Sequence, residues 1–281
     1  MTAYAGKRVL LASMHKKEIA INQPFLELIG CEIVVTNDFN TDTFGTFSGE
    51  ISRELSAYET LKRKAVVAAE TLDFDYVISS EGAFGPHPNN PFINSDTEML
   101  LFYDRTKNLF IADYEISTNT NHAELEISQD SVYTDNFFKW LNKVKFPSHG
   151  LIIKSESIII EKGICDAVAL ENAIKDGFSK HTILKLETDM RAMMNPSRMN
   201  VIKALAYKLA KRVASSCIKC GTPGFGTIEK SGYLFCELCF QETRVPKYED
   251  TKCLSCDYYE RKEINTKIQF ADPRYCDYCN P

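Results

Sequence analysis

The sequence has no long hydrophobic run near its beginning, and this absence limits where the protein is expected to work. Residues 1–18, MTAYAGKRVLLASMHKKE, contain only about six consecutive apolar residues before charged residues return. A secretory signal needs roughly 7–15 apolar residues, and a membrane-spanning helix needs about 20. We therefore expect a cytoplasmic protein that does not span a membrane.

A large excess of charge of one sign is also missing. The chain has 33 Lys and Arg residues against 38 Asp and Glu residues, which gives a net charge of −5. This balance provides no general attraction to nucleic acid or to anionic membranes. The 281 residues are 44% hydrophobic and include 17 Phe and 13 Tyr. This composition is typical of a globular protein, and a chain of this length is expected to form a large domain and a smaller second one.

Cysteines are abundant, and most of them fall in Cys-x-x-Cys pairs near the C-terminus. In a secreted chain this would indicate disulfides, but in a reducing compartment the repeated spacing indicates metal. Two intervening residues allow a tight turn that directs both thiolates at one ion, and two such pairs complete a tetrahedral zinc site. We predict two zinc ions bound by Cys217, Cys220, Cys236, Cys239, Cys253, Cys256, Cys276 and Cys279.

The spacing leaves open which pairs share an ion. Consecutive pairs would share one in tandem zinc ribbons, and alternate pairs would share one in an interleaved module of the RING type. Four thiolates close the coordination of zinc, so both ions are expected to be structural and catalysis must lie elsewhere. Acidic and basic residues are nearly balanced after residue 212, so the negative zinc–thiolate centres make this module a poor match for a phosphate backbone.

The pattern before the cysteines predicts an α/β domain over residues 1–214, followed by the zinc-ribbon module over 215–281. Strands are expected at 8–13 and 31–36, with a helix over 16–29 that makes them a parallel βαβ unit. A helix over 53–72 and a strand over 75–80 follow. Residues 97–104 and 109–116 predict an antiparallel hairpin, so the central sheet is mixed and flanked by helices. One or two more strands are expected in 151–160, and a helix in 165–180.

Three segments of the large domain bring polar side chains together. The first is the strand-to-helix turn that contains Ser13, His15, Lys16 and Lys17. Hydroxyl, imidazole and ammonium groups at a helix N-terminus suit a phosphate group. The alternative is an ordinary solvated first turn of a helix.

The second segment is SSEGAFGPHP, which places Glu81 directly after a buried strand and predicts a Gly/Pro-shaped loop. Ligands of open α/β sheets bind at the carboxyl ends of the strands. Glu81 is therefore a candidate magnesium ligand or general base. His87 is a candidate substrate contact or an ordinary loop histidine.

The third segment, ETDMRAMMNPSRM, contains Arg191 and leads into a long helix. Asn195 is a favourable N-cap and Pro196 a favourable first helical residue. Arg198 then lies in the first turn, where a guanidinium and free N–H groups suit a phosphate. Because no acidic residue occurs between Asp189 and Glu229, this basic stretch either faces a polyphosphate or forms a basic surface near the acidic zinc module.

Several segments together resemble a prokaryotic family with C-terminal zinc ribbons that is known only as a domain of unknown function. They are KRVLLASMHKKE, SSEGAFGPHP, KFPSHGLI, ETDMRAMMNPSRM and CGTPGFG. They span nearly the whole chain, but this resemblance implies no activity.

The order of elements over about residues 7–214 is similar to that of the inosine triphosphatase-like nucleotide pyrophosphatases, which include the Maf proteins. In this resemblance the turn from Ser13 to Glu18 takes the place of a polar loop that enters the first helix. Thr46-Phe47 and a helix with Lys62 and Lys64 follow, and Glu81 takes the place of a carboxylate. The sequence departs from the family because His15 replaces Asn in a shorter loop, and a single Glu81 stands where many relatives have paired aspartates.

Later in the chain, Pro196-Ser197-Arg198 resembles a Ser-His-Arg segment that contacts the nucleotide, and His149 is expected to line the same cleft. The resemblance implies an inosine triphosphatase-like fold and magnesium-dependent hydrolysis of a nucleoside triphosphate or related phosphoanhydride. Glu81, helped by Glu18, would bind magnesium and position water. The phosphates would be neutralised by Lys16, Lys17, Arg191 and Arg198.

Two other functions stay open. One is a non-catalytic protein that binds a nucleotide or other phosphorylated small molecule, or a protein partner, with its zinc module as a contact surface. The other is an RNA-binding protein that uses the basic helix, although the acidic module makes nucleic acid the less favoured partner. The sequence decides neither the substrate nor whether the chain forms a homo-oligomer.

Overall fold

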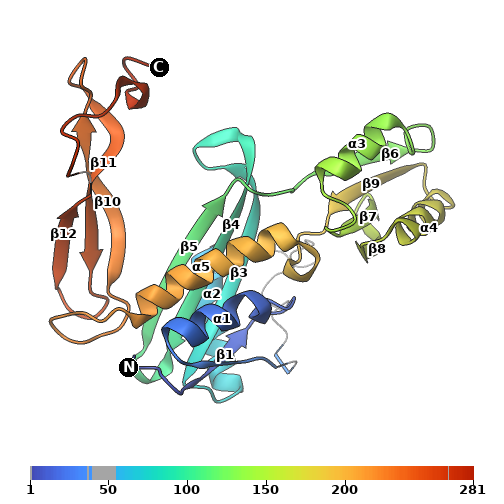
Figure 1. The fold of residues 1–281 in the computed structure, drawn as a ribbon. Helices are drawn as coiled ribbons and strands as arrows, with labels where there is room; N and C mark the ends of the chain where they lie inside the picture. The colour runs from blue at the N-terminus through green and yellow to red at the C-terminus, as the bar shows by residue number, and fades with distance from the viewer. Residues whose placement is uncertain (1, 37, 40–54, 265) are drawn as a thin grey trace. The chain divides into compact units, whose positions relative to one another are not determined.

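The computed structural model describes residues 2–36, 38–39, 55–264 and 266–281 (Figure 1). The chain divides into two compact units. One is Tyr4–Ala210, and the other is Lys211–Pro281 together with the residues before Tyr4. Thr46 and Phe47, named in the sequence comparison above, lie outside the described residues.

A mixed sheet forms the centre of the unit Tyr4–Ala210, as the sequence predicts. Strand β1 is parallel to β2 and β3, whereas β4 is antiparallel to β3 and β5. Helix α1 (Glu18–Leu28) joins β1 to β2 and completes the expected βαβ unit. The strand order is β2 (Glu32–Val34), β1 (Arg8–Ala12), β3 (Tyr76–His87), β4 (Asn90–Asp104) and β5 (Leu109–Ser117).

Local sequence signals define the helices that pack on this sheet. Helix α1 ends before Gly30, whose φ of 79° allows its N–H to bond back to the carbonyls of Phe25 and Leu26 at 3.1 and 3.0 Å. Ser56 caps the N-terminus of helix α2 (Ala57–Thr71), because its hydroxyl accepts the N–H of Glu59 at 3.2 Å. The apolar side of α2 packs with β1, β3 and β4 in a core of Leu10, Leu61, Ala65, Ala68, Val77 and Leu101.

The loop predicted after residue 80 is instead part of a long hairpin. Strand β3 continues to His87 and pairs with β4 along its whole length, from Tyr76 opposite Asp104 to His87 opposite Asn90. The prediction was wrong because the glycines and proline of this segment indicate a loop only when no neighbouring strand pairs with them. Pro86 is tolerated because it lies beside the register shift near the turn. The result is that Glu81 lies in the middle of a strand.

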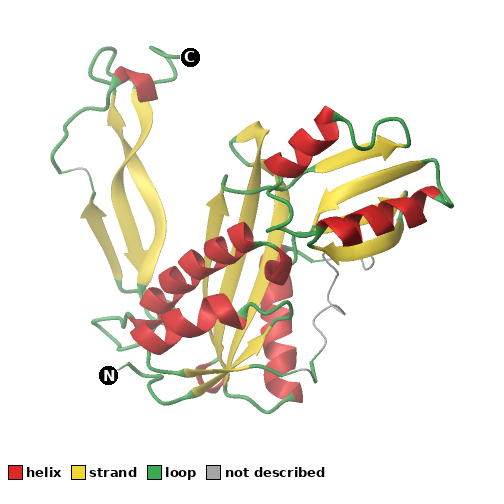
Figure 2. Ribbon diagram, turned by 45° about the vertical axis from the view of Figure 1, so that its right-hand side comes forward, coloured by secondary structure: helices red, strands yellow, loops and turns green. Residues whose placement is uncertain are grey.

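A second sheet with its own core lies in the same unit, where the sequence predicted a single central sheet. Its neighbouring strands are all antiparallel, and the segment 151–160 contributes to two of them. Helices α3 (Asp135–Lys143) and α4 (Ala167–Phe178) belong to this part of the chain (Figure 2). The strand order is β6 (Glu124–Ser128), β9 (Ile183–Thr188), β7 (Leu151–Ser155) and β8 (Ile158–Ile164).

Helix α5 (Pro196–Ala214) has the buried apolar face expected from its pattern, with Ile202, Leu205, Ala206, Leu209 and Val213 almost fully buried. Short 3-10 helices occur at Arg105–Lys107, Ala192–Met194 and Pro273–Tyr275. Within the described residues, no helix combines the length and apolar character needed to cross a membrane.

The unit Lys211–Pro281 contains an antiparallel sheet in the order β10 (Gly226–Phe235), β11 (Glu242–Lys252) and β12 (Tyr259–Glu263). Asp250 in the central strand links all three strands. Its carboxylate accepts hydrogen bonds from Ser231 of β10 and from Tyr259 and Arg261 of β12. Because Asp250 is fully buried among these donors, it fixes the register of the sheet from its centre.

Candidate active site and metal centres

A cluster of buried charged side chains lies beside the β3–β4 hairpin. Its members come from the turn before α1, from α2, from the hairpin itself and from the first turn of α5. Each is at most 6% exposed, although buried charges are costly unless they are paired. Within the described residues this buried charged cluster consists of Lys17, Lys64, Glu81, Asp96, Glu98 and Arg198.

Arg198 is held at the centre of the cluster by contacts on several sides. Its Nε lies 2.5 Å from Oε1 of Glu98, and its Nη1 donates to the carbonyl of Met190. The guanidinium carbon lies 5.0 Å from the centre of the Phe84 ring. Gly82, directly opposite Glu98 in the hairpin, leaves the necessary space, since a Cβ there would clash with both Arg198 and Glu98.

The N-terminus of α5 brings Arg198 into this position. Asn195 accepts the N–H of Arg198 at 3.0 Å through its Oδ1, which confirms the predicted N-cap. The Asn195 amide in turn donates to Oδ1 of Asn121 at 2.8 Å. A buried amide pair therefore fixes the start of the helix and, with it, the direction of the arginine.

Lys17 enters the cluster from the turn between β1 and α1. The backbone of His15 and Lys16 is left-handed, with φ of 70° and 57°, and the next residue directs its side chain inward. The Lys17 Nζ donates to Ser80 Oγ at 2.7 Å and lies 3.7 Å from Oε2 of Glu98. Burial lowers the pKa of Lys17 to about 8, against the opposing effect of Glu98.

Two carboxylates of the cluster have very different partners. Glu81 forms a buried ion pair with Lys64 of α2. Within the described residues, no N–H or alcohol group donates to either oxygen of Asp96, and its side-chain neighbour is the carboxyl group of Glu98. Burial first, and then the neighbouring Glu98, raise the pKa of Asp96 to about 8. Burial would also raise the pKa of Glu98, but Arg198 and Lys17 together hold it below its usual range.

The eight paired cysteines of the second unit gather in two groups of four. In each group the Sγ atoms all lie within 4.8 Å of one another. Neighbouring Sγ atoms are 3.8 Å apart for Cys217 and Cys256 and 3.5 Å apart for Cys239 and Cys276. A tetrahedron with zinc–sulfur distances of about 2.3 Å has edges of about 3.8 Å, so each group fits one zinc ion.

The grouping decides between the two alternatives that the spacing left open. Cys217 and Cys220 join Cys253 and Cys256, and the second group is Cys236, Cys239, Cys276 and Cys279. Alternate pairs therefore share a site, which is the interleaved arrangement. The turn that contains Cys217 and Cys220 is closed by a hydrogen bond of 2.8 Å from the N–H of Gly221 to the carbonyl of Cys217. Gly221 has a φ of 73°, which suits glycine.

Comparison with protein families finds a match over most of the chain. A model described as a domain of unknown function, DUF6671, matches residues 64–281. The chain belongs to the DUF6671 family. A comparison with curated proteins finds no match.

In this DUF6671 chain, the structure brings together only some of the residues that the sequence indicated. Lys17, Glu81 and Arg198 belong to the buried charged cluster. His149 lies nearby, because its Nε2 is 2.9 Å from the hydroxyl of Ser197, the residue before Arg198. Burial lowers the pKa of His149 from its usual value, and Lys145 adds to this effect.

Other predicted residues lie outside the cluster. His87 is at the hairpin turn, where its Nδ1 accepts the N–H of Asn89 at 3.1 Å. It lies about 20 Å along the strand from Glu81, at roughly 3.3 Å per residue. Arg191 pairs with Asp189, with Nη2 and Oδ2 2.5 Å apart. It is therefore held by its own neighbour and does not join Arg198.

The turn before α1 keeps its remaining polar side chains nearer the surface. Lys16 is exposed, whereas Ser13, His15 and Glu18 are partly buried. Ser13 donates its hydroxyl to the carbonyl of Met14 at 3.2 Å. The described contacts do not bring Glu18 to Glu81, so its expected role beside that carboxylate gains no support.

Asp96 and Glu98 were missed because the apolar run that follows them dominates the prediction of the strand. The overlooked signal is their spacing, since residues two apart in a strand lie on the same face. Lys64 was noticed only through a family resemblance. Its position on the sheet-facing side of α2, among Leu61, Ala65 and Ala68, was the local signal that it faces a buried carboxylate.

The basic face of α5 is partly neutralised within its own unit. Lys208 lies 2.9 Å from Oδ1 of Asp113 and donates to the carbonyl of Tyr114. Lys203 donates to Oε1 of Gln23 at 2.9 Å. These contacts favour a structural role for this face over a phosphate-binding one.

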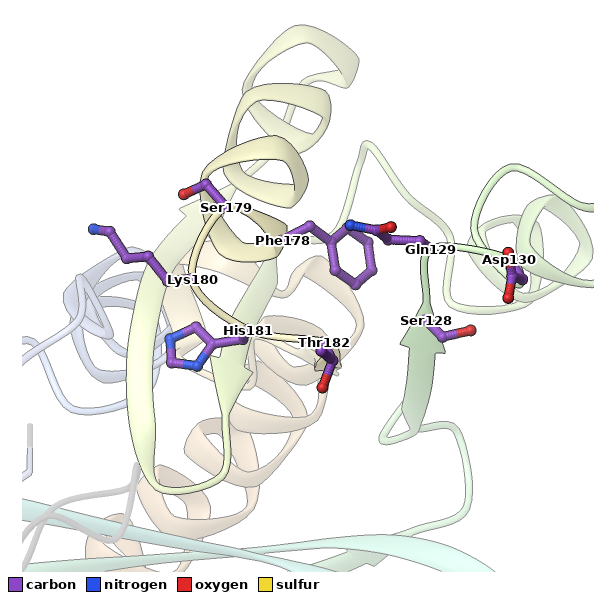
Figure 3. A pocket seen from close by; sticks show the side chains of 8 residues that line it. All are labelled: Ser128, Gln129, Asp130, Phe178, Ser179, Lys180, His181 and Thr182. Atoms are coloured by element: carbon purple, nitrogen blue, oxygen red, sulfur yellow. The ribbon is translucent and has the colours of Figure 1, made fainter.

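A separate surface pocket of about 440 Å³ lies at one end of the second sheet. Figure 3 shows the side chains that line it, which come from the end of β6 and from the segment between α4 and β9. The lining residues are Ser128, Gln129, Asp130, Phe178, Ser179, Lys180, His181 and Thr182. None of the residues singled out by the sequence lies in it.

Proposed function

We propose that this protein hydrolyses a phosphoanhydride, and specifically that it is a magnesium-dependent nucleoside triphosphate pyrophosphohydrolase. The observation that supports this proposal is the buried charged cluster. In it, Lys17, Lys64 and Arg198 come from three separate elements and meet carboxylates of one hairpin. Charged groups with strongly perturbed pKa values concentrate at functional sites.

The charges suit the reaction. Cleavage of a phosphoanhydride moves negative charge onto the leaving pyrophosphate, and fixed cations stabilise that charge. Their effect is larger in a buried site than in water, because the local dielectric is lower. Lys17 and Arg198 are held by Ser80, Glu98 and Met190, so little reorganisation is needed when the substrate arrives.

The turn before α1 supports a place for the phosphates. Backbone N–H groups at a helix N-terminus attract anions. Lys16 is exposed on this turn while Lys17 reaches inward from it. In the proposed complex, Lys16 meets the substrate from the solvent side and Lys17 meets it from the buried side.

Glu81 is the proposed general base. It accepts a proton from the water that attacks the α-phosphorus, and the bond to the bridging oxygen of the leaving pyrophosphate breaks. Lys64 holds the carboxylate in place through its ion pair. Magnesium, when bound, would supply further neutralisation of the phosphate oxygens.

The order of elements also supports the finer proposal of an inosine triphosphatase-like fold. A strand–helix–strand unit is followed by a helix with Lys64, by a strand with Glu81 and, later, by a helix that begins with Ser197 and Arg198. His149 contacts Ser197 from another segment. The segment Pro196-Ser197-Arg198 has no histidine where the Ser-His-Arg pattern has one, and we propose that His149 provides this imidazole.

The deciding experiment measures release of pyrophosphate and phosphate from a panel of ordinary and modified nucleoside triphosphates, with and without magnesium. We expect turnover by the wild type and a loss of about 100-fold or more in Glu81→Gln. Glu115→Gln is the matched control, because Glu115 is a half-exposed carboxylate of the neighbouring strand β5 paired with Lys208. Arg198→Lys keeps the charge but loses the planar contacts, and should lose most of the activity.

Absence of turnover on every substrate, with folded and zinc-loaded protein, would contradict the hydrolase proposal. The second candidate is then a non-catalytic binding protein. The exposed aromatic and aliphatic side chains of the zinc unit favour it, since Phe240 and Tyr278 are 63% and 76% exposed. Such side chains are common at surfaces that contact other proteins.

A further inference from the structure

Three carboxylate oxygens of β4 are buried, and no N–H or alcohol group of the described residues donates a hydrogen bond to them. They are both oxygens of Asp96 and Oε2 of Glu98. Asp96 is 1% exposed and Glu98 is fully buried, so bulk water does not solvate them. A buried, unsatisfied carboxylate is costly, and proteins tolerate one where a ligand completes its bonding.

The distribution of partners leaves Asp96 as the unmatched charge. Lys64 is paired with Glu81, and Arg198 is paired with Glu98. The only other cation of the buried charged cluster, Lys17, also lies beside Glu98. Within the described residues no cation is at ion-pair distance from Asp96, so its negative charge needs either a proton or a metal ion.

We propose that Asp96 and Glu98, and not Glu81, provide the carboxylate oxygens that bind the divalent cation of this site. This inference rests on the proposed function, because phosphate oxygens would complete the coordination. Magnesium in such sites is held by one or two carboxylates together with substrate phosphates and water, and seldom by a complete protein cage. One aspartate and one glutamate oxygen match that requirement.

The strand geometry favours a shared ion. Asp96 and Glu98 are two residues apart on β4, so their side chains lie on the same face. Their carboxyl groups also lie within hydrogen-bonding distance of each other. Glu81 is the weaker candidate because it is paired with Lys64 and, unlike Glu98, has no carboxylate oxygen among the buried ones that lack a hydrogen-bond donor in the described part of the chain.

The test uses manganese alone and then manganese with pyrophosphate, on the full-length, zinc-loaded protein. Binding is measured by electron paramagnetic resonance. We expect the wild type to bind Mn²⁺, more tightly with pyrophosphate, and Asp96→Asn to lose about tenfold or more of that affinity. Asn has the shape of Asp without its charge, and its amide can still hydrogen-bond to Glu98, the side chain that lies beside Asp96.

Two matched variants complete the comparison. Glu81→Gln removes the alternative carboxylate. It is expected to change Mn²⁺ affinity by less than about threefold, because the pyrophosphate oxygens and the two carboxylates of β4 remain as ligands. Asp113→Asn changes a carboxylate of the adjacent strand that is paired with Lys208 and should leave binding unchanged. Equal Mn²⁺ affinity in Asp96→Asn and wild type would overturn the proposal, as would loss confined to Glu81→Gln.

A measurement on the wild type covers the case in which Asp96→Asn does not fold. Iron(II) in place of Mn²⁺, with ascorbate and peroxide, cleaves the backbone near the bound metal. Cleavage that includes residues 95–99 supports the site, and cleavage of the unit Tyr4–Ala210 that spares these residues rejects it. Mn²⁺ binding that depends on Asp96, without nucleotide hydrolysis, would refute only the proposed function. Hydrolysis with normal Mn²⁺ binding in Asp96→Asn would refute only the site.

Discussion

Arg198 in the first turn of α5 forms a buried ion pair with Glu98 of β4, a residue 100 positions earlier in the chain, with Nε and Oε1 2.5 Å apart. The side chains are 4% and 1% exposed, so neither charge can be solvated if the other is removed. This pair therefore couples the start of α5 to the hairpin that carries the other acidic residues.

The first prediction concerns this pair. Glu98→Gln removes the carboxylate charge that lies beside the buried Arg198 and Lys17, and it should cost about 3–5 kcal/mol of unfolding free energy. The double variant Glu98→Gln/Arg198→Met also removes the charge of the arginine, so its loss should be smaller than the sum of the two single losses. Urea unfolding of all four proteins measures the difference. Additive losses would show that the two side chains act independently.

The second prediction uses two glycines of the same strand. An added Cβ at Gly82 would clash with Arg198 and Glu98, whereas one at Gly85 would meet nothing within 4 Å. Gly82→Ala should therefore cost about 1–3 kcal/mol, and Gly85→Ala should cost less than about 0.5 kcal/mol. Thermal unfolding compares them directly. Similar losses in both variants would contradict the packing around Arg198.

The sequence predicts well whatever depends on local chemistry. The βαβ unit, the cap at Asn195, the hairpin of β4 and β5 and the cysteine pairs all follow from spacing or from single residue types. The second sheet was not predicted, because its strands are short and their pairing joins distant segments. Strand β6 pairs with β9, almost 60 residues later.

The residues of the candidate site likewise include some that local sequence patterns indicated and some that they did not. Lys17, Glu81 and Arg198 were identified because each was expected to follow a strand or to lie at the start of a helix. Asp96 and Glu98 were not, because they lie inside a strand whose partner is the supposed loop after residue 80. Only the register of β3 against β4 brings Gly82, Glu98 and Arg198 together, and register is a tertiary property that single-strand patterns do not contain.

The third prediction is that Asp104, the last residue of β4, makes the stability of the fold depend on pH. Burial would raise the pKa of Asp104, but hydrogen bonds from Thr106, Lys107 and Tyr4 keep it below its usual value. Because the folded-state pKa is lowered, the stabilisation is present above the unfolded pKa of about 3.9 and is lost as pH falls through the folded value.

Asp104→Asn should therefore cost about 2 kcal/mol at pH 7, and the difference from wild type should shrink below about pH 4. Urea unfolding between pH 3 and pH 7 provides the measurement. Asp73→Asn is the control, since the side chain of Asp73 is 95% exposed and its loss should be small at every pH. A difference for Asp104→Asn that stays constant down to pH 3 would contradict this account.

The last prediction distinguishes the interleaved zinc sites from tandem ones by counting metal. Cys217 and Cys253 belong to one group, and Cys236 belongs to the other. Cys217→Ser/Cys253→Ser should therefore retain one zinc per chain, whereas Cys217→Ser/Cys236→Ser should retain none. Tandem sites would reverse these two results, because Cys217 and Cys236 would then share an ion. Elemental analysis after gel filtration gives the zinc content. The double variant that keeps one zinc should also keep part of the unit folded, because thiolate–zinc binding supplies folding free energy at each site separately.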